Sequence, residues 1–546
     1  MNDFLKLDFN ERCDKNNSLT SACSYGDNLW RYPERQPLEK RIAELNDLTA
    51  NQVICTNGGD EAIMILMRII KEGKRLILPL PAFSQYTWGI ESWQQDALLI
   101  KPNADLSIDI QATREAINKN SSTVTILTRP NNPTGEMIEL NDLTSLIQAA
   151  QNNNGWVFLD EAYIEFSDDS STSEILLKQF DNLVILRTLS KAFGLAGIRL
   201  GYLLGAEQLI AQFRVRCMPF NIATPSLQIA EQALQSENLE EMESYCQQIR
   251  FNRKILVDWL NSVGIEVFPS QANFIFLRLP KGQAKAIKSF MKKNNVLVRA
   301  FDEDEIKNCL RITIPFDLTK LLSILEQSLQ PKLICMDMDG VLVDTSDSYD
   351  QCVITTVKKL SGQDIPIELV EDLRKQGGFN NDWILSKRLL DDLGINLALE
   401  EVTSVFQDYY LGKNNDGLVA NELSLVSSEL THTIEQSSTS SFAIVTGRPR
   451  VEAKAGQLLT RLTQLELISL DDVDTGKPSP EGIQKLQNKY SSMSWMCGDN
   501  PDDMQAAVSS NSLAIGIGTN KTDSLYKAGA DIVLDSINDI QDWIKW

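Results

Sequence analysis

The sequence predicts an α/β fold with two parts, at about residues 1–330 and 331–546, each built around a largely parallel sheet. Short apolar runs rich in β-forming residues alternate with amphipathic helical patterns along the chain. This alternation is typical of parallel sheets whose strands are joined by helices. At 546 residues the chain is also too long for one hydrophobic core. The alternation restarts near residue 330, so we place the division there.

Composition excludes several classes of protein. The formal net charge of -22 argues against nucleic acid and anionic membranes as partners. No apolar run approaches the roughly 20 residues of a membrane helix, and the polar start does not read as a secretory signal. The nine cysteines form no Cys-x-x-Cys pair, and His432 is the only histidine, which disfavours a zinc site. We expect a soluble, cytoplasmic protein.

Five strands are predicted in the first part, at residues Gln52–Thr56, Leu76–Pro79, Val124–Thr128, Trp156–Asp160 and Leu183–Arg187. In parallel sheets, ligands bind at the carboxyl ends of the strands. The residues that follow each strand are therefore the first candidates for a site.

The first two strand ends offer an anion site and an aromatic ring. Gly58, Gly59 and Asp60 stand between a strand and a helix, where backbone N–H groups can hold a phosphate. Two glycines alone are a weak signal. Phe83 follows the next strand and could stack on a flat ring, although an aromatic residue there is as often part of the core.

The next two strand ends carry polar side chains. Asn132, in RPNNPTG, either belongs to a plain turn or donates its amide to a ligand oxygen. Asp160, in LDEAY, either caps a helix or pairs with a cationic ring nitrogen. Tyr163 could reach the same ligand oxygen as Asn132.

Lys191 follows the last predicted strand, in RTLSKAFGLAGIRLG. A partly desolvated lysine at a sheet edge is a usable nucleophile towards an aldehyde. Thr188, Ser190 and Arg199 supply hydroxyls and a guanidinium, which suit a phosphate. A lysine beside serines is most often a surface residue. The interpretation of Lys191 as a nucleophile therefore depends on the candidate residues that follow the other strands.

The chain from about Leu7 to Leu329 resembles the fold type I pyridoxal-phosphate aminotransferases, and closely the histidinol-phosphate aminotransferase group; seven segments carry the resemblance. They are YPERQPLEKRIAEL, NGGDEA, PNNPTG, DEAYIEF, RTLSKAFGLAGIRLG, QANFIFLR and NCLRITI, in family order. The resemblance implies a large and a small domain, with pyridoxal 5′-phosphate held by Lys191 as a Schiff base. It implies that Asp160 pairs with the pyridine nitrogen, and that Asn132 and Tyr163 contact the phenolic oxygen.

The resemblance also implies substrate and subunit contacts. Arg311 matches the arginine that grips the donor carboxylate, and Arg299 a second arginine for carboxylate or phosphate, although a strand-edge salt bridge is the alternative. Two arginines suit a site that binds glutamate and a phosphorylated ketone in turn. Tyr32 matches a tyrosine that contacts the neighbouring subunit's cofactor, which implies a homodimer. Phe83 and the segment FNERCD depart from the family pattern at the substrate end.

The second part begins after a predicted helix, Leu318–Leu329, with a buried strand at Lys332–Met336. Residues 345–441 are mostly helical in pattern, with a loop at 377–381 that could face the site. Strands resume at Phe442–Thr446 and Ser494–Gly498.

The motif DMDGVLVD places Asp337 and Asp339 directly after the first of these strands. A calcium loop is excluded, because Val341 and Ser348 occupy ligand positions and a strand precedes the motif. Instead, Asp337 could attack phosphorus while Asp339 protonates the leaving oxygen.

Carboxylates and a phosphate in one site need cations. Asp499 and Asp503, in GDNPDD, could bind Mg²⁺, and Lys477 could neutralise the nucleophile. Thr446 ends another strand and could hydrogen-bond a phosphoryl oxygen.

The motifs DMDGVLVD, VTGRP, GKPSPEG and GDNPDDM resemble the haloacid dehalogenase superfamily from residue 332 to 546. The resemblance implies a Rossmann-like core with a helical cap at about residues 345–441. It implies a magnesium phosphatase whose metal site involves Asp337, Asp339, Asp499 and Asp503.

We therefore expect a bifunctional enzyme. The first part would transfer an amino group between glutamate and a phosphorylated keto compound, and the second would hydrolyse a phosphate monoester. Two alternatives stay open: a pyridoxal-phosphate decarboxylase of a phosphorylated amino acid, and a second part that acts as a sensor.

Overall fold

The computed structural model describes residues 5–12, 31–168, 172–376, 379, 381–412 and 416–544. The chain forms two compact units. The first holds Met1–Leu279 and Asn295–Lys320, and the second holds Pro280–Asn294 and Leu321–Trp546. The segment Pro280–Asn294 thus lies with the second unit, while the division near residue 330 stays a proposal.

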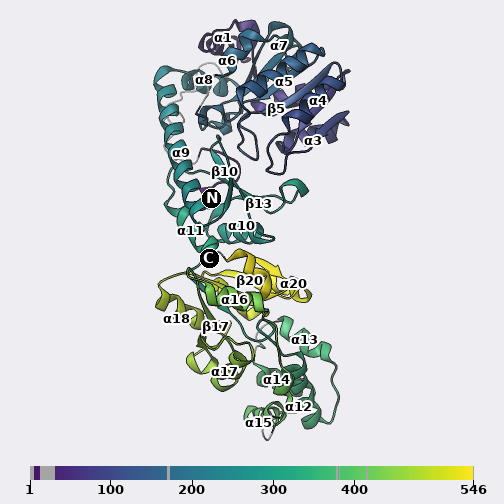
Figure 1. The fold of residues 1–546 in the computed structure, drawn as a ribbon, viewed down its shortest axis with the longest axis vertical. Coiled ribbons are helices and arrows are strands. Elements are labelled where there is room, and N and C mark those ends of the chain that lie inside the picture. Colours follow the sequence, from purple (N-terminus) through teal and green to yellow (C-terminus); the bar gives the residue numbers. More distant parts are fainter. Residues whose placement is uncertain are drawn as a thin grey trace. The chain divides into compact units, whose positions relative to one another are not determined.

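The first unit is built on a seven-stranded sheet in the order β2-β8-β7-β6-β5-β3-β4. Figure 1 draws this sheet with β5 labelled, among the helices that flank it. Only β8 runs antiparallel to its neighbours. The strands are β2 (Val53–Thr56), β3 (Arg75–Pro79), β4 (Ala97–Ile100), β5 (Thr123–Thr128), β6 (Trp156–Asp160), β7 (Leu183–Thr188) and β8 (Gly201–Gly205). All five predicted strands are present, whereas β4 and β8 were not predicted.

Helices flank this sheet. They are α1 (Gln36–Leu45), α2 (Gly58–Lys71), α3 (Ser84–Trp93), α4 (Ile110–Lys119), α5 (Leu140–Asn152), α6 (Thr172–Gln179), α7 (Glu207–Arg214), α8 (Thr224–Ala233) and α9 (Ser236–Ser262). α2 shows why they form. Its first turn carries Asp60 and Glu61, and its last turn Arg68 and Lys71, so both ends match the helix dipole. Its buried apolar face packs against β7 and β8.

A second sheet in the first unit is antiparallel, in the order β12-β13-β10-β9. Its strands are β9 (Glu266–Phe268), β10 (Phe274–Arg278), β12 (Arg299–Ala300) and β13 (Cys309–Thr313). β1 (Leu5–Lys6) pairs in parallel with β11 (Val296–Leu297). Thr313 N, in β13, donates to Leu7 O at 2.9 Å and so ties the N-terminal segment to the small sheet, which brings Asp8 to Arg311.

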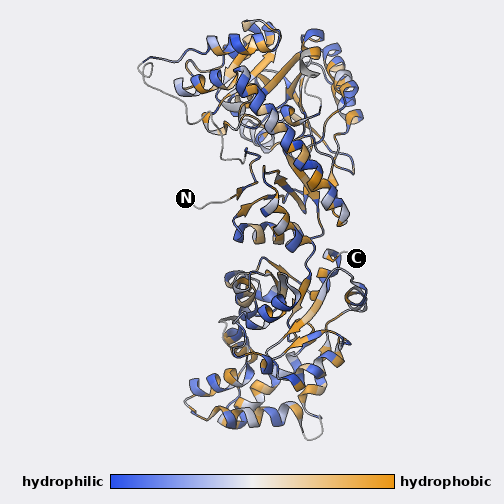
Figure 2. Cartoon of the chain, turned by 90° about the vertical axis from the view of Figure 1, so that its left-hand side faces the viewer, coloured by the Kyte–Doolittle hydropathy of each residue, from blue (hydrophilic) through white to orange (hydrophobic). Residues whose placement is uncertain are grey.

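The second unit holds a six-stranded, fully parallel sheet in the order β18-β17-β14-β19-β20-β21. Its strands are β14 (Leu333–Met336), β17 (Ser441–Val445), β18 (Glu466–Ile468), β19 (Ser494–Gly498), β20 (Leu513–Ile517) and β21 (Ile532–Leu534). Orange strands mark the apolar interior in Figure 2. The three predicted strands of this part are present, and β18, β20 and β21 are additional.

A helical insertion leaves this unit at β15 (Val343–Asp344) and returns at β16 (Leu423–Ser424), which pair with each other. It contains α12 (Gln351–Ser361), α13 (Ile367–Gln376), α14 (Asp382–Asp392) and α15 (Leu399–Leu411). These helices share a core that includes Val353, Leu389 and Phe406. The remaining helices of the unit are α10 (Gln283–Lys293), α11 (Thr319–Leu329), α16 (Ser428–Gln436), α17 (Arg450–Leu459), α18 (Glu481–Tyr490), α19 (Pro501–Ser509) and α20 (Thr522–Ala528).

Helix α10 packs against β20 and β21, although it precedes them by a long stretch of chain. Lys293 Nζ lies 2.7 Å from the buried carboxylate of Asp531. Trp543 Nε1 donates to Lys281 O at 3.2 Å. A Cβ at Gly282 would lie 2.8 Å from Ile532, so the backbone approaches closely here.

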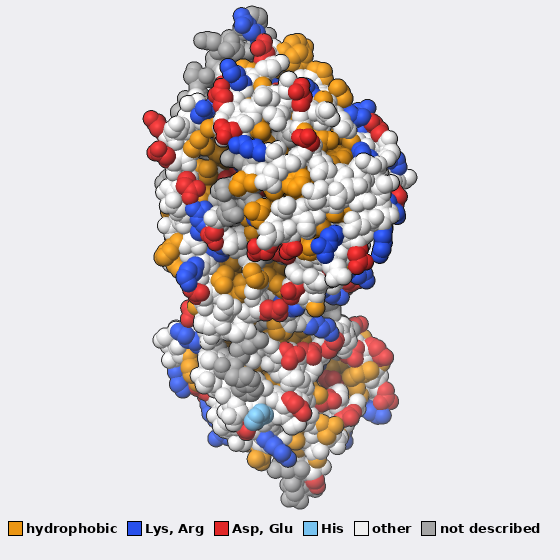
Figure 3. Space-filling view, turned by 45° about the horizontal axis from the view of Figure 1, so that its top comes forward, with side chains coloured by type: hydrophobic (Ala, Val, Ile, Leu, Met, Phe, Trp, Pro, Cys, Tyr) orange, Lys and Arg blue, Asp and Glu red, His pale blue; other side chains and the backbone are white. Residues whose placement is uncertain are grey.

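Within the described ranges, no helix is long and apolar enough to cross a membrane. On the face drawn in Figure 3, acidic and basic side chains are interspersed and hydrophobic ones lie in small groups.

Candidate active sites

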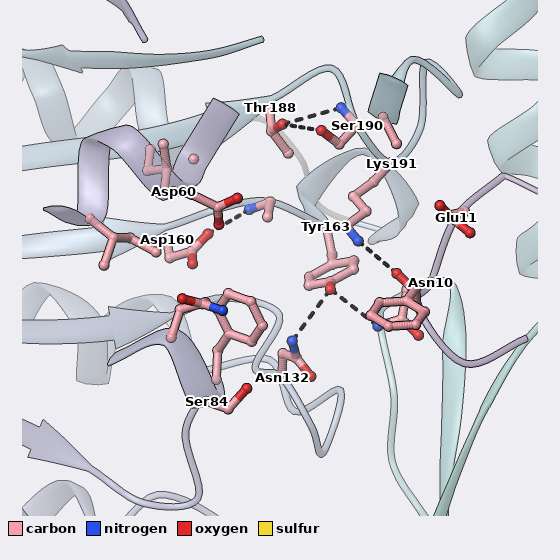
Figure 4. A pocket seen from close by; sticks show the side chains of 18 of the residues that line it. Asn10, Glu11, Asp60, Ser84, Asn132, Asp160, Tyr163, Thr188, Ser190 and Lys191 are labelled. Carbon is pink, nitrogen blue, oxygen red and sulfur yellow. Dashed lines mark hydrogen bonds between the residues drawn. The ribbon is translucent and has the colours of Figure 1, made fainter. Parts of the chain in front are cut away.

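The carboxyl ends of β5, β6 and β7 open into a cavity of about 330 Å³ in the first unit. Figure 4 shows the side chains that point into it from the large sheet and from the N-terminal segment. Its lining contains most of the predicted cofactor residues: Gly59, Asp60, Phe83, Asn132, Asp160, Tyr163, Thr188, Ser190, Lys191 and Arg199, with Arg299 and Arg311.

Lys191 reaches into the middle of this cavity. It follows β7, and its Nζ donates a hydrogen bond to Phe9 O at 2.9 Å. The same nitrogen lies 5.4 Å from the centre of the Tyr163 ring. Among the described residues the amine donates to a backbone carbonyl and forms no ion pair, so an aldehyde can take its place as partner.

Asp160 ends β6 and is buried. Burial raises its pKa to about 6, against hydrogen bonds that lower it. Those bonds come from Tyr86 OH at 2.7 Å and Ala162 N at 3.0 Å. Asp160 has no ion-pair partner in the described part of the chain, and a buried carboxylate of this kind favours a cation beside it, such as a protonated ring nitrogen.

The Tyr163 hydroxyl accepts hydrogen bonds from two side-chain amides (Figure 4). Asn10 Nδ2 donates to it at 3.1 Å and Asn132 Nδ2 at 3.4 Å. Asn10 is in turn held by Thr313, whose Oγ1 donates to Asn10 Oδ1 at 2.9 Å. These donors converge on one oxygen and could equally hold a ligand oxygen.

The start of α2 and Arg199 form the anion end of the cavity. Arg199 Nη2 lies 2.7 Å from Asp60 Oδ2. A Cβ at Gly58, which has φ +71°, would lie 2.6 Å from Arg199 Nη2, so only glycine allows this approach. On the other side, Thr188 Oγ1 donates to Ser190 Oγ at 3.0 Å.

Arg311 is buried in β13 at the opposite end. Burial lowers its pKa to about 10. It donates to Asn132 Oδ1 and, at 2.7 Å, to Asp8 O, while its Nε has no hydrogen-bond partner among the described residues. Arg299 lies opposite Arg311 across the strand pair β12–β13. A buried guanidinium with a spare donor suits a carboxylate ligand.

Tyr32 lies elsewhere: it is 77% exposed and stacks on Phe220 with ring centres 4.5 Å apart. Two residues were missed by the sequence reasoning. Tyr86 lies inside α3, where its spacing resembles that of any core residue. Asn10 belongs to FNERCD, and its pattern gave no sign that β1 would carry it to Tyr163.

These observations fit pyridoxal 5′-phosphate. The cavity offers an amine, a buried carboxylate, amide donors beside a hydroxyl, and a glycine-lined helix start with an arginine. Each matches one functional group of that cofactor: aldehyde, ring nitrogen, phenolic oxygen and phosphate.

The second candidate site lies at the carboxyl ends of β14 and β19. Asp337 follows β14 and is buried, and Lys477 Nζ lies 2.7 Å from its Oδ1. Lys477 also pairs with Asp503. Burial and the neighbouring carboxylate of Asp503 raise the pKa of Asp337. Burial alone would lower the pKa of Lys477, but Asp337 and Asp503 outweigh it and raise the pKa.

Asp499 completes an acidic group with Asp337 and Asp503, whose ligand atoms lie within 4.8 Å of one another. Asp503 is fixed by a capping box, since its Oδ2 accepts from Asn500 N at 3.1 Å. A Cβ at Gly340 would lie 2.2 Å from Asp499 Oδ2, so glycine is required beside the group. Three converging carboxylate oxygens suit a divalent cation such as Mg²⁺, which relieves their repulsion.

The side chain of Asp339, predicted as a further metal residue, is directed elsewhere. Arg448 Nε donates to Asp339 Oδ1 at 2.7 Å. Arg448 also holds Glu422 in a bidentate pair, with both bonds at 3.0 Å. Arg448 was not singled out from the sequence. It fixes the predicted proton carrier and ties it to the return strand of the insertion.

Thr446 directly follows β17 and is buried. Lys477 Nζ donates to the preceding carbonyl, Val445 O, at 3.2 Å, so these two motifs meet. In the predicted loop at 377–381, residues 377, 378 and 380 lie outside the described residues. Asn381 lines a cleft together with Asp339.

Comparison with known proteins identifies the two parts. Residues 8–325 match the family "aminotransferase class I and II". A histidinol-phosphate aminotransferase of Pectobacterium carotovorum subsp. carotovorum (strain PC1) is 35% identical over 292 residues, which is 52% of this chain and 80% of that protein. A putative histidine biosynthesis bifunctional protein of Photorhabdus laumondii is 35% identical over 294 residues, but only 36% of its length is covered.

Solved structures show the same fold. A putative histidinol-phosphate aminotransferase from Erwinia carotovora atroseptica has a TM-score of 0.53 at 22% identity, over 59% of this chain and 96% of that one. A histidinol-phosphate aminotransferase from Sinorhizobium meliloti, in complex with pyridoxal-5′-phosphate, has a TM-score of 0.53 at 20% identity, over 58% and 88%.

Residues 331–511 match the family "haloacid dehalogenase-like hydrolase". The match covers the helical insertion and the strands β14, β17, β18 and β19 of the second unit. The predicted fold class is therefore confirmed for both parts. The chain belongs to the class I and II aminotransferases, of the pyridoxal-phosphate fold type I, and carries a haloacid dehalogenase-like hydrolase part after it.

Proposed function

We propose that the first part transfers an amino group between glutamate and a phosphorylated keto compound, of the histidinol-phosphate:2-oxoglutarate type. We propose that the second part hydrolyses a phosphate monoester with Mg²⁺. The observation that carries the first half is the convergence of Lys191, Asp160 and Arg311 on one cavity. The names of the relatives support the substrate class.

Each residue of the first site has a defined task in this proposal. Pyridoxal 5′-phosphate, when bound, supplies an electron sink for the amino-acid carbon. Lys191 holds the cofactor and moves the proton of that carbon. Asp160 keeps the ring nitrogen protonated, and Asn132 and Tyr163 orient the phenolic oxygen.

The ends of the cavity select the ligands. Arg199 and the N–H groups at the start of α2 hold the cofactor phosphate. Arg311 binds the carboxylate of glutamate, and Arg299 takes part in binding the second anionic group. Thr188 and Ser190 add hydroxyls at the phosphate end.

In the second site, Asp337 attacks phosphorus, and the bond from phosphorus to the ester oxygen breaks as Asp339 protonates that leaving oxygen. Asp339 then activates a water molecule, which takes the phosphoryl group from Asp337 and releases inorganic phosphate. Lys477 and Thr446 bind the phosphoryl oxygens. Asp337, Asp499 and Asp503 hold Mg²⁺, which screens the approach of carboxylate and phosphate. Asp339 remains part of the proposed metal site, although its side chain pairs with Arg448.

A homodimer is part of the proposal. The exposed side chains of Tyr32 and Phe220 stack on each other, and Val215 and Met218, nearby in sequence, are also exposed; these apolar side chains support it. Tyr32 would contact the cofactor phosphate of the partner. A cytoplasmic location is also proposed, and the absence of paired cysteine motifs supports it.

A coupled assay tests both halves. The chain is supplied with glutamate, imidazole acetol phosphate, pyridoxal 5′-phosphate and Mg²⁺, and 2-oxoglutarate and inorganic phosphate are measured. We expect both products. Absence of 2-oxoglutarate would contradict the histidinol-phosphate type, and release of CO₂ from a phosphorylated amino acid would indicate a decarboxylase. 2-Oxoglutarate without phosphate would show that the two sites use different substrates.

A further inference from the structure

A cleft in the second unit adjoins the proposed hydrolytic site. Its lining comes from the sheet loops, from α17 and from the helical insertion: Asp339, Tyr349, Asn381, Asp382, Trp383, Gly447, Arg448, Pro449, Glu452 and Leu470. Asp339 is the proposed proton donor to the leaving oxygen. An ester attacked by Asp337 would therefore extend its leaving group into this cleft.

Arg448 is the cationic side chain in this lining, and its donors are already used. Its Nε donates to Asp339, and its two terminal nitrogens donate to Glu422. One of these nitrogens also donates to Tyr410 OH at 3.3 Å. An anionic leaving group would thus find no free cation in this guanidinium.

Glu452 is the main unexplained charge in the cleft. It is 7% exposed, and it accepts hydrogen bonds from Tyr349 OH and, at 2.9 Å, from Gln407 Nε2. Both donors are neutral, and Glu452 forms no ion pair within the described part of the chain. The nearby Arg448 acts on Glu452 through space but is paired with Asp339 and Glu422. A buried carboxylate without a cation in direct contact is costly, and a cationic ligand would lower that cost.

Asp382 adds a second carboxylate. It pairs with Arg374, which also pairs with Asp350 at 2.8 Å. One guanidinium between two carboxylates leaves this group with a net negative charge. The potential in the cleft is therefore negative on the side of the insertion as well as on the side of α17.

Two aromatic side chains, Trp383 and Tyr349, line the same space. The Tyr349 ring already stacks on Tyr410 and has the Arg448 guanidinium 5.0 Å from its centre, so Tyr349 contributes through its hydroxyl, which holds Glu452. An aromatic contact to an organic cation would come from Trp383. The cavity measures about 20 Å³, close to the room that one water molecule needs. An ammonium group has about this size.

We propose that the second site hydrolyses small phosphate monoesters that carry a cationic amine, and that Glu452, with Trp383 and Tyr349, recognises the amine. This inference rests on the phosphatase function proposed above. It places the reaction after an amination of a phosphorylated ketone, because such an amination yields a phosphate ester with a new ammonium group. The first unit is proposed to carry out that class of reaction.

Three phosphate esters of similar size test the inference on the full chain with Mg²⁺. They are 2-aminoethyl phosphate, propyl phosphate and phosphoglycolate, which have a cationic, a neutral and an anionic leaving group. Release of inorganic phosphate gives kcat/KM for each. We expect 2-aminoethyl phosphate to exceed propyl phosphate by about tenfold or more, as a buried charged contact allows, and phosphoglycolate to be the poorest.

Glu452→Gln keeps the size of the side chain and removes its charge. We expect it to bring the ratio of 2-aminoethyl to propyl phosphate towards one, through a higher KM for the amine. Glu400→Gln, on the exposed face of α15, is the matched control and should keep the wild-type ratio.

The outcomes separate the two levels of the proposal. No phosphate from any of the three esters would overturn the phosphatase function and the inference with it. Phosphate from all three with equal kcat/KM would leave the phosphatase function standing and overturn the inference. A wild-type preference that persists in Glu452→Gln would overturn the role of Glu452. Should that variant misfold, the wild-type ratio of the three esters decides.

Discussion

The two candidate sites differ in the sign of the charge they present. In the first unit, Lys191, Arg199 and Arg311 converge on a cavity of about 330 Å³. In the second unit, Asp337, Asp499 and Asp503 converge, and the adjoining cleft measures about 20 Å³. The first site is prepared for a large anionic ligand by its own side chains. The second is prepared for cations, and must acquire positive charge before it can accept a phosphate.

The difference extends to how each site is held together. Side chains of the first site lie on two sheets and on the N-terminal segment, and their partners are mostly neutral amides and hydroxyls. Those of the second site follow strands of one sheet and are joined by ion pairs through Lys477 and Arg448. A change of charge should therefore perturb the second site more widely than the first.

The largest expected effect separates the two chemistries. Lys191→Ala should lower amino transfer by about a thousandfold or more, because the proton carrier is removed, and should leave phosphate release from directly supplied 2-aminoethyl phosphate intact. Asp337→Asn should do the reverse. In each variant, 2-oxoglutarate is measured with imidazole acetol phosphate and glutamate, and inorganic phosphate is measured with 2-aminoethyl phosphate, so each variant is the control for the other. Loss of both products in either variant would contradict two independent sites.

Substrate affinity in the first site gives the next effect. Arg311→Lys should lower kcat/KM for glutamate by about a hundredfold, since a lysine cannot form the bidentate contact to a carboxylate. Most of the loss should lie in KM, measured at saturating keto acceptor. Lys178→Arg, at an exposed position of α6, is the control for a substitution between lysine and arginine away from the site, and it should leave kcat/KM for glutamate unchanged. An unchanged KM would show that Arg311 does not bind the donor.

Stability of the first unit should depend on pH through Asp160. Its pKa rises from 3.8 to about 6 on burial, so its contribution is present below about pH 4 and lost as pH passes 6. A shift of about two units corresponds to about 3 kcal/mol. In the cofactor-free chain, Asp160→Asn should gain this amount relative to wild type between pH 4 and 8. Hydrogen exchange of the β6 amides measures it, and a constant difference would refute the ionisation of Asp160.

The smallest effect concerns α10 in the second unit. Lys293→Met should lower the stability of that unit by about 1 kcal/mol, because Asp531 is left buried with one cation fewer. Asp531→Asn together with Lys293→Met should recover part of the loss. The stability of the second unit in both variants is measured by thermal unfolding, with the loss of phosphatase activity on heating as the signal. If Lys293→Met has no effect, the ion pair between Lys293 and Asp531 contributes nothing to stability.

Much of both sites could be predicted from the sequence, because the end of each strand is marked by a change from apolar to polar residues. Asn132, Asp160 and Lys191 each follow an apolar run, and parallel topology brings such positions to one edge. The same reasoning found Asp337 and Asp499. It located the strands to within about a residue, since their apolar runs are short and bounded by polar turns.

The residues that were missed depend on tertiary packing. Tyr86 reaches Asp160 from within a helix, and Asn10 reaches Tyr163 only through the pairing of β1 with β11. Glu452 occupies the first turn of α17, where an acidic residue is expected on the surface. Its burial depends on the insertion helices, whose position the sequence pattern does not specify.

The packing of α10 against β20 and β21 has a consequence for synthesis. The helix leaves the ribosome long before the two strands that cover it. During that interval its apolar side chains, among them Ile287 and Phe290, lack this part of their final surroundings. Until the last strands emerge, the nascent chain is therefore an aggregation-prone intermediate with exposed apolar surface. Chaperone binding should be concentrated in this stage of translation.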